Sequence, residues 1–365
     1  MSCPGILSGS HDPILAHNSV AERVLRLASL SLGTYDCSMK RRLVSIPGLI
    51  LGAIILTTLI PIWFPLVILI DLCRRQFRLP LLRLLSFAVC WVWLETAGVL
   101  GAFLLWLTGQ RKNLSRHYAL QRWWAARLLG ALGKTCGIRV EVVNIESLSS
   151  GPVLMFARHA SLADSLVSAY VVTTLAQMNP RYVLKRELLA DPCLDVVGQR
   201  LPNHFLDRNA NDAQPELDAL EKLVSDMDAS TVGIIFPEGT RANDAKRTRA
   251  LEKISSIDPS RGQRLNAMQH LLPPRPAGAA AMMRGNPTAD VVLVWHIGFE
   301  GLDTFGGILR AISTKMAPIR FVMRRVSRSQ IASDNIESFT EWLDNEWMRM
   351  DQEVEVALNE RNHHG

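Results

Sequence analysis

Two long stretches with almost no charge place the strongest limit on how this chain can fold. Residues 43–70 contain no Asp, Glu, Lys or Arg, and residues 84–108 contain only Glu95. At about 1.5 Å per helical residue, each stretch is long enough for the roughly 30 Å hydrocarbon core of a bilayer. Three prolines would bend the first helix, so a spanning and a re-entrant helical hairpin over residues 43–108 both fit. Glu95 has two possible roles: a functional carboxylate, or a protonated or paired group at a contact between helices.

Basic residues are distributed unequally around this hairpin and predict which side of a membrane the remaining chain occupies. Eight lie on the side shared by the N-terminal tail and the rest of the chain: Lys40, Arg41, Arg42, Arg111, Lys112, Arg116, Arg122 and Arg127. Four lie in the loop between the stretches: Arg74, Arg75, Arg78 and Arg83. The positive-inside rule therefore predicts an integral membrane protein whose main domain is on the cytoplasmic face. The polar tail, residues 1–42, lacks the apolar core and cleavage site of a signal peptide.

The composition excludes several other classes of protein. Of the 365 residues, 48% are hydrophobic, which is too apolar for a disordered chain. The formal net charge is +6, but no basic run of five or more residues occurs, so a nucleic acid is not an expected partner. The six cysteines form no C-x-x-C pair and no zinc-ligand spacing, so neither a disulfide framework nor a structural metal is expected.

Two further segments have the pattern of amphipathic helices. Residues 109–137 combine Arg, Trp and Leu at helical spacing, with Trp123 beside Trp124. Such a helix suits the membrane interface, where indole rings lie at headgroup depth, and equally suits the surface of a domain core. Residues 331–365 form the second segment, in which apolar side chains recur every three or four residues.

Short apolar runs alternate with helical patterns after residue 137. The runs predicted as strands are 138–144, 153–157, 181–185, 232–236 and 291–297, with 319–326 as an edge strand. The helical patterns cover 162–177, 186–199, 214–228 and 335–358. Several of the runs are apolar at every position, as in strands that are buried on both faces. The prediction is an α/β fold in which the membrane-embedded hairpin precedes a helix-flanked, mostly parallel or mixed β-sheet domain over 138–330.

A first polar cluster directly follows the apolar run 153–157. In such folds, functional groups gather on the loops beyond the carboxyl ends of the strands. His159 in the turn and Asp164 in the first turn of the next helix can share a hydrogen bond, which would make the imidazole an oriented general base. Asp164 also follows Ser161 by three residues, as in a capping box, so a structural role fits as well.

A second polar cluster follows the run 232–236. Gly239 in a rigid turn exposes backbone amides, and Arg241 offers a planar fork of donors that suits a phosphate. Glu238 is placed to receive a hydroxyl or to steady a basic neighbour. The alternative is an ordinary strand-to-helix turn that carries a surface ion pair.

The two clusters, together with two blocks between them, resemble a known family. RHASLAD (158–164) and FPEGTR (236–241) enclose KREL (185–188) and NHFLDR (203–208) in the sequence. In this order the four blocks are similar to those of the glycerolipid acyltransferases, the lysophosphatidic acid acyltransferase or 1-acylglycerol-3-phosphate O-acyltransferase family. The resemblance covers roughly residues 140–300.

The resemblance implies an enzyme that transfers a fatty acyl group from acyl-CoA or acyl-carrier protein to a free hydroxyl of a glycerolipid. His159 would remove the hydroxyl proton, while Asp164 would orient the ring and stabilise its charge. The residues that would hold the acceptor and its phosphate are Arg208, Glu238, Gly239, Thr240, Arg241 and Lys185. The tetrahedral centre needs oxyanion donors, for which Gly239 N–H is a candidate. Neither a metal nor a prosthetic group is implied.

Three segments depart from the family pattern. Arg158 stands where the family usually has Asn, which puts a positive charge beside the base or a donor beside the substrate phosphate. The last block, usually proline-bearing, falls at 291–298 without a proline and carries His296, for which a structural role is expected. The loop 273–278 resembles an insertion, and its Arg275 is a candidate headgroup contact.

The expected reaction converts lysophosphatidic acid to phosphatidic acid at a lipid bilayer. Acylation of glycerol-3-phosphate and CoA-independent acyl exchange between lipids are alternatives within the same chemistry. A non-catalytic membrane protein that binds anionic lipid is the alternative from another class. The absence of a G-x-S-x-G turn disfavours a serine hydrolase.

Overall fold

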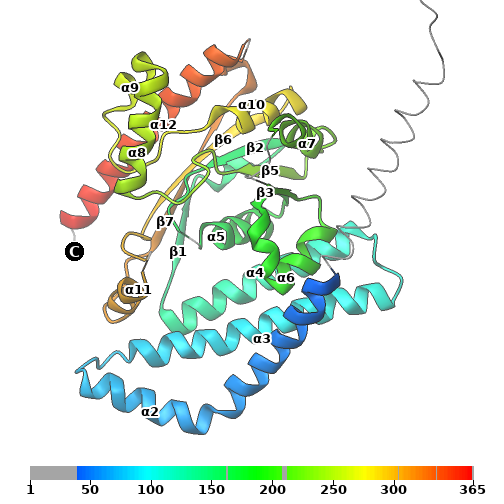
Figure 1. Cartoon of the computed structure of the whole chain (residues 1–365), viewed down its shortest axis with the longest axis vertical. Coiled ribbons are helices and arrows are strands. Elements are labelled where there is room, and N and C mark those ends of the chain that lie inside the picture. Colours follow the sequence, from blue (N-terminus) through cyan, green and yellow to red (C-terminus); the bar gives the residue numbers. More distant parts are fainter. Residues whose placement is uncertain (1–38, 162, 208–211, 303, 334, 364–365) are drawn as a thin grey trace, which may run out of the picture. The chain divides into compact units, whose positions relative to one another are not determined.

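The computed structural model describes residues 39–161, 163–207, 212–302, 304–333 and 335–363 (Figure 1). Its contacts divide the chain into two units, Met1–Gly48 and Leu49–Gly365. The β-sheet and every residue of the candidate site lie in the second unit. Most of the expected polar tail, up to residue 38, lies outside the described residues.

The first uncharged stretch forms two helices rather than one. One helix covers Met39–Thr58, and α2 covers Ile60–Cys73 with Pro61 in its first turn, where the missing proline N–H is tolerated. Helix α3, Pro80–Leu107, follows a short turn, and two N–H groups in its first turn donate to Asp71 Oδ2 at 3.1 and 3.2 Å. The helices Met39–Thr58 and α3 are long and apolar enough to cross a membrane, judged by length and composition alone.

The second unit continues with strands and helices that mostly alternate. The strands are β1 (Val140–Val143), β2 (Val153–Ala157), β3 (Asn179–Lys185), β4 (His204–Leu206), β5 (Thr231–Ile235), β6 (Asp290–Ile297) and β7 (Ile319–Val326). The α-helices are α4 (Leu114–Cys136), α5 (Asp164–Tyr170), α6 (Pro192–Val196), α7 (Gln214–Val224), α8 (Asp244–Ile257), α9 (Pro259–Leu265), α10 (Pro276–Gly285), α11 (Phe305–Ile312) and α12 (Ile336–His363). A π-helical turn at Val171–Leu175 extends α5.

In the described part of the chain the strands form one sheet in the order β1-β7-β6-β2-β5-β3-β4. The β6–β7 pair is antiparallel and the other neighbouring pairs are parallel, so the predicted α/β fold with a mostly parallel sheet is confirmed. The prediction that 319–326 is an edge strand is wrong, since β7 lies between β1 and β6. Strand β4 forms the opposite edge and was not predicted, because three residues carry too little periodicity.

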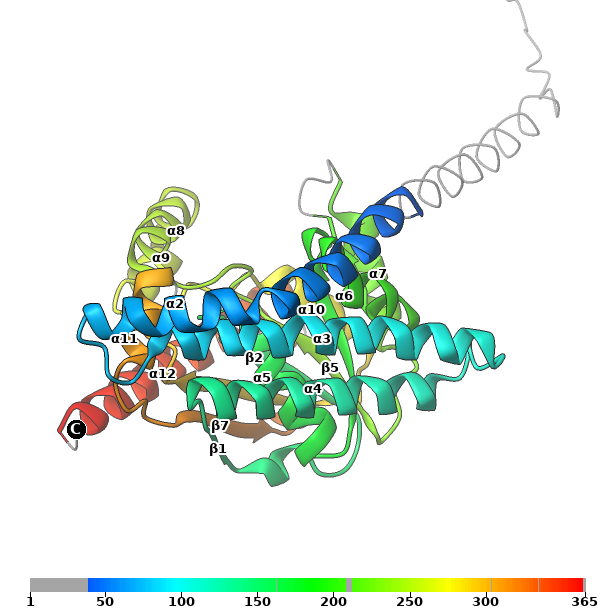
Figure 2. The same ribbon diagram turned by 90° about the horizontal axis from the view of Figure 1, so that it is seen from below.

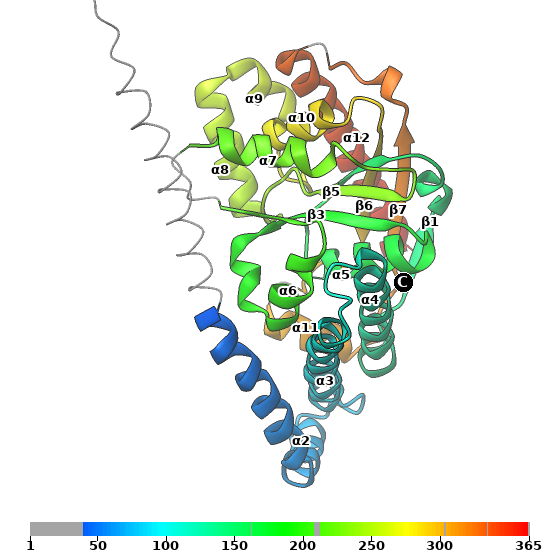
Figure 3. The same cartoon turned by 90° about the vertical axis from the view of Figure 1, so that its right-hand side faces the viewer.

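Both faces of the sheet are covered by helices. Successive side chains of a strand point to opposite faces, and in β2 Leu154 and Phe156 join one apolar core while Val153 and Met155 join the other. The first core lies against α7, α10 and α12, and the second lies against α4 and α5, on the side that also carries α3 and α6 (Figure 3). This two-sided burial explains why β2 is apolar at every position.

Helix α3 lies alongside α4 (Figure 2), and residues near both of its ends are hydrogen-bonded to other elements of the second unit. Near its start, Arg83 donates from Nε to Thr135 O at 2.8 Å and from Nη1 to Ile312 O at 2.6 Å. Near its end, the Ala102 carbonyl accepts a hydrogen bond from Arg200. Glu95 is only 1% exposed, so protein surrounds this carboxyl.

Helix α12 fixes the loop that leads into α10. The Asp351 carboxylate accepts the backbone N–H groups of Gln269, His270 and Leu271 at 2.7–2.8 Å. Arg261 of α9 forms a two-pronged ion pair with Asp344 of α12, at 2.7 and 2.8 Å. The sequence predicted α12 as an amphipathic helix but gave no sign of these anchoring contacts.

Candidate active site

The site begins where parallel neighbouring strands end at the same edge of the sheet. Strand β2 leads into His159, β5 leads into the Gly239 turn, and β3 ends at Lys185. Because β5 pairs in parallel with both β2 and β3, these carboxyl ends lie side by side. The topology therefore brings together the clusters that the sequence separates.

His159 and Asp164 are in direct contact. His159 Nδ1 lies 3.0 Å from Asp164 Oδ2. Asp164 is the first residue of α5 and is 1% exposed, while His159 lines a cavity. With Nδ1–H donated to the carboxylate, Nε2 of the neutral ring carries the lone pair, as a general base requires.

The Asp164 carboxylate has a second role as a backbone anchor. Its Oδ2 also accepts the N–H groups of Ala160 at 2.7 Å and Ser161 at 2.8 Å. The capping-box pattern of the sequence is realised only in the bond from the Ser161 N–H to Asp164, because α5 begins at Asp164 and its N-cap is Ala163. Burial alone would raise the pKa of Asp164, but the neighbouring His296 imidazole and the hydrogen bonds from His159 and Ser161 hold it below its ordinary value.

Glu238 lies behind the site and joins three loops. It is 2% exposed, and its Oε1 accepts the N–H of His159 at 2.9 Å while Oε2 accepts the N–H of Leu272 at 3.1 Å. Burial raises the pKa of this carboxyl to about 8. Both oxygens point at the backbone and Glu238 does not line the cavity, which differs from the expectation that it contacts the acceptor.

A basic side chain from another loop, Arg275, lies against the Gly239 turn. Gly239 has φ +71°, a left-handed conformation that favours glycine. The loop before α10 is held to this turn by the bond from Arg275 N–H to Pro237 O at 2.9 Å, and a Cβ on Gly239 would lie 3.4 Å from Arg275 Nε. The Gly239 N–H, the candidate oxyanion donor, donates to Phe236 O at 2.9 Å within the turn.

The remaining predicted residues divide between the cavity wall and its surroundings. Arg241 and Lys185 line the cavity. Thr240 does not line it, and its Oγ1 accepts a hydrogen bond from Lys246 at 3.3 Å. Arg208 lies outside the described residues.

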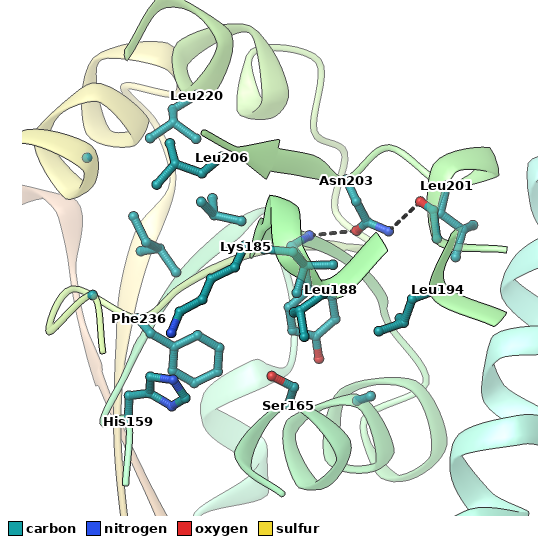
Figure 4. A pocket seen from close by; sticks show the side chains of 18 of the residues that line it. His159, Ser165, Lys185, Leu188, Leu194, Leu201, Asn203, Leu206, Leu220 and Phe236 are labelled. Carbon is teal, nitrogen blue, oxygen red and sulfur yellow. Dashed lines mark hydrogen bonds between the residues drawn. The ribbon is translucent and has the colours of Figure 1, made fainter. Parts of the chain in front are cut away.

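A cavity of about 600 Å³ opens beside His159. Figure 4 shows Lys185 extending toward His159 and Phe236 on one side, with leucine side chains on the others. Leucine side chains from the helical segments that flank the sheet and from the loop before β4 line much of it: Leu188, Leu194, Leu201, Leu217 and Leu220. Gly98 of α3 and Trp124 of α4 also reach the cavity, so the apolar helix α3 and the amphipathic helix α4 form part of its wall.

Several contributors to the site had no signal in the sequence. The Phe236 ring packs on the His159 ring with centroids 5.0 Å apart, and Leu272 N–H holds Glu238. Arg158 is 4% exposed and donates to the His296 carbonyl, so its side chain faces the interior rather than the substrate. Within the described residues, no group of three His, Cys, Asp or Glu side chains is placed to hold a metal ion.

A histidine–carboxylate pair at the wall of an apolar cavity, at the carboxyl edge of a parallel sheet, has the geometry for proton abstraction from a largely apolar substrate. Residues 139–293 match the sequence model of the family described as Acyltransferase. The chain therefore contains an acyltransferase domain and is an acyltransferase enzyme.

Two further comparisons accompany this match. The chain is similar to the crystal structure of the 1-acyl-sn-glycerophosphate (LPA) acyltransferase PlsC from Thermotoga maritima, with a TM-score of 0.48 and 18% sequence identity. The similarity covers 75% of this chain and 95% of that chain. The comparison with curated proteins finds no match.

Proposed function

We propose that the chain is a membrane-bound O-acyltransferase that acylates the free hydroxyl of a lysophospholipid, with lysophosphatidic acid as the acceptor and phosphatidic acid as the product. The observation that carries the proposal is the contact of His159 Nδ1 with Asp164 Oδ2 at 3.0 Å, with the histidine at the wall of an apolar cavity. In this proposal His159 Nε2 takes the hydroxyl proton as the oxygen attacks the acyl thioester.

The proton path follows from the tautomer that Asp164 imposes. As the acceptor oxygen bonds to the thioester carbon, its proton passes to His159 Nε2, and the resulting imidazolium is stabilised by the buried Asp164 carboxylate. When the tetrahedral centre collapses, the thiolate leaves and accepts this proton from His159, which returns the imidazole to its neutral form. No covalent intermediate on the enzyme is required, since binding aligns the two substrates and alignment lowers the barrier by several kcal/mol.

The charge around His159 supports an anionic acceptor. Lys185, Arg241 and Arg275 line the same cavity as His159. Guanidinium groups bind phosphate through paired hydrogen bonds, and lysine binds it as a point charge. Arg208, which the family resemblance implies as a further phosphate ligand, belongs to the same proposal.

The apolar part of the cavity suits a fatty acyl chain. A volume of about 600 Å³ with mostly leucine and other apolar lining has room for an extended hydrocarbon segment beside the reacting hydroxyl. The acyl donor in the proposal is acyl-CoA or acyl-carrier protein, whose thioester carbon would lie next to His159. Metal and prosthetic-group chemistry is not part of the proposal.

The N-terminal helices support a location at a membrane. Large apolar side chains are exposed along them, including Leu51, Ile54, Ile55, Trp91, Phe103 and Trp106. Continuous exposed apolar surface of this kind marks a membrane or protein contact. We propose that it is embedded in lipid, with the catalytic unit on the cytoplasmic face.

The contacts of α3 favour the re-entrant alternative over a full crossing. A helix of 28 residues is about 42 Å long, and a crossing would separate its ends by the whole bilayer. Both ends are instead bonded to the catalytic unit, through Arg83 at the start and Ala102 at the end. In the proposal α3 therefore lies along the catalytic unit and enters the membrane from one side.

The test is acyl transfer by the purified chain in detergent or lipid nanodiscs. Labelled acyl-CoA and acyl-carrier protein are supplied with lysophosphatidic acid, with glycerol-3-phosphate, or with a lysolipid and a diacyl phospholipid without CoA. We expect transfer to lysophosphatidic acid and a loss of about 100- to 10,000-fold in His159→Ala, with no loss in the exposed control His363→Ala. Liposome binding without any acyl transfer would contradict the proposal.

A further inference from the structure

We infer that His296 is a positioning residue that holds the second oxygen of Asp164 and thereby sets the basicity of His159. The inference rests on the proposed function, because it assigns His296 a role in the same proton transfer. It replaces the sequence-based expectation of a structural histidine with satisfied hydrogen bonds.

The sheet register places His296 at the level of the catalytic pair. Strand β6 runs parallel to β2 with Ala157 opposite Val294, and the Arg158 N–H donates to Val294 O at 2.9 Å. His296 lies two residues beyond Val294, so its side chain points to the same face of the sheet. That face carries α5, whose first residue is Asp164.

The two oxygens of Asp164 have unequal surroundings. Oδ2 accepts three N–H groups, from His159, Ala160 and Ser161. Oδ1 is buried and has no fully formed hydrogen bond to any described residue, and His296 Nε2 lies 3.4 Å from it. An unsatisfied buried carboxylate oxygen is costly, and His296 Nε2–H is the donor in reach.

The surroundings of His296 hold its ring in one position and favour the neutral form. The side chain is 1% exposed, packs edge-on against Phe299 and stacks on Phe321, with ring centroids 5.1 and 6.2 Å apart. The charged groups that face it are Asp164 from α5, Arg158 from the loop after β2 and Glu300 from the loop after β6. Burial lowers the pKa of His296, and Arg158 acts in the same direction against the two carboxylates.

This arrangement gives His296 a defined effect on the base. A neutral ring with its proton on Nε2 donates to Oδ1, so His159 and His296 hold Asp164 from opposite sides. The second donor fixes the carboxylate rotamer and withdraws negative charge from Oδ2. Without it the carboxylate is less well oriented and more basic, which stabilises the His159 imidazolium and raises the pH at which His159 loses its proton.

The test compares two substitutions that differ in the donor at the Nε2 position. His296→Phe keeps an aromatic ring against Phe299 and Phe321 but has no N–H. His296→Gln places an amide N–H near the position of His296 Nε2. Phe321→Leu is the packing control, since it loosens the aromatic contact and leaves the imidazole in place.

For His296→Phe we expect kcat to fall by about tenfold to a hundredfold, the range of one hydrogen bond to a charged group. We expect the acceptor KM to stay within about twofold and the acidic limb of the kcat/KM profile to move up by about one pH unit. His296→Gln is expected to regain most of kcat and the wild-type limb. Phe321→Leu is expected to lower the melting temperature without moving the limb.

Two results would overturn the inference. One is an unchanged acidic limb of the kcat/KM profile in His296→Phe. The other is a loss of kcat that is equal in His296→Phe and His296→Gln and proportional to the loss of folded protein. The His159 ring titration, followed by NMR of labelled histidine and assigned with His159→Ala, supplies a readout independent of turnover. If the wild-type chain transfers no acyl group, the proposed function fails. The inference is then still decided by whether the His159 titration midpoint rises in His296→Phe.

Discussion

The Glu238 carboxylate accepts the backbone N–H of His159 at 2.9 Å, so a buried side chain of the second polar cluster holds the main chain of the first. The same carboxylate accepts the Leu272 N–H, which joins a third loop to the site. The catalytic histidine of the proposal is thus positioned by its backbone through Glu238 and by its ring through Asp164. Both restraints come from buried acids that do not line the cavity.

Replacing Asp164 with Asn removes the negative charge that stabilises the His159 imidazolium. We expect kcat for acyl transfer to fall by about 100- to 10,000-fold, while the far-ultraviolet circular dichroism stays close to wild type. The matched control is Asp244→Asn, because Asp244 is exposed and pairs only with Arg247 of its own helix. Comparable activity of Asp164→Asn and the control would contradict the assignment of Asp164.

Glu238 predicts a pH dependence of stability. Its pKa in the folded protein is raised by burial to about 8 from an ordinary value of 4.5, so the folded state binds the proton more tightly than the unfolded state. The corresponding stabilisation is complete below about pH 4.5 and is lost as the pH rises through about 8, by at most about 1.4 kcal/mol per pH unit.

The measurement for Glu238 is urea unfolding in detergent between pH 5 and pH 9. Relative to Glu238→Gln, which has no titrating group at this position, the wild type is expected to lose stability with rising pH. Glu238→Gln is also expected to be less stable at pH 5, since an amide nitrogen cannot accept the N–H of His159 or of Leu272. If the plots of unfolding free energy against pH were parallel for the two proteins, Glu238 would not bind a proton in the folded state over this pH range.

Arg275 is expected to discriminate between acceptors with and without a phosphate. Because its guanidinium lies over Gly239 at the cavity wall, Arg275→Ala is expected to raise the KM for lysophosphatidic acid by about tenfold or more. The KM for acyl-CoA and the kcat/KM for a monoacylglycerol are expected to stay within about twofold. Arg284→Ala, a surface variant in the following helix, is the control.

The volume of the cavity predicts a preference for acyl-chain length. Leu188 lines the cavity and is half-buried, so Leu188→Trp is expected to fill part of it without opening the core. In competition assays the ratio of kcat/KM for an 18-carbon to a 12-carbon acyl-CoA is expected to fall by about tenfold. Val356→Trp, an exposed position on α12, controls for the added indole. An unchanged ratio would place the acyl chain elsewhere.

The ion pair of Arg261 with Asp344 is expected to stabilise the fold. Asp344 is fully buried, and Arg261→Met leaves it with the longer contact to Arg264 at 3.7 Å, so the substitution is expected to lower the free energy of unfolding by about 3 kcal/mol. Arg349→Met breaks a surface pair within α12 and is expected to cost at most about 1 kcal/mol. The double variant Arg261→Met with Asp344→Leu is expected to regain most of the stability, as measured by urea unfolding.

The parts of the fold that the sequence predicted well depend on local patterns. Strands β2, β5 and β6 are mostly apolar because helices cover both faces of the sheet, and this signal is visible in the residues themselves. The contact of His159 with Asp164 was also predictable, because Asp164 follows His159 by only five residues and a turn that leads into a helix keeps two such residues close together.

The parts that the sequence did not predict depend on contacts between distant segments. The position of β7 inside the sheet depends on its pairing with β1 on one side and β6 on the other, and the residues of β7 alone do not reveal these partners. The backbone bonds that bury Glu238 involve Leu272, thirty-four residues further along the chain. The contact of His296 with Asp164 follows from the register of β6 against β2. No short motif carries such information.

Asp351 of α12 holds the three N–H groups that precede Leu272, and Leu272 in turn holds Glu238 beneath the base. Helix α12 follows every other described element in the sequence and supplies no residue to the cavity wall. Removing it would leave His159 and Asp164 in contact but would release the loop that carries Arg275. The completeness of the site therefore depends on a helix that stands outside it.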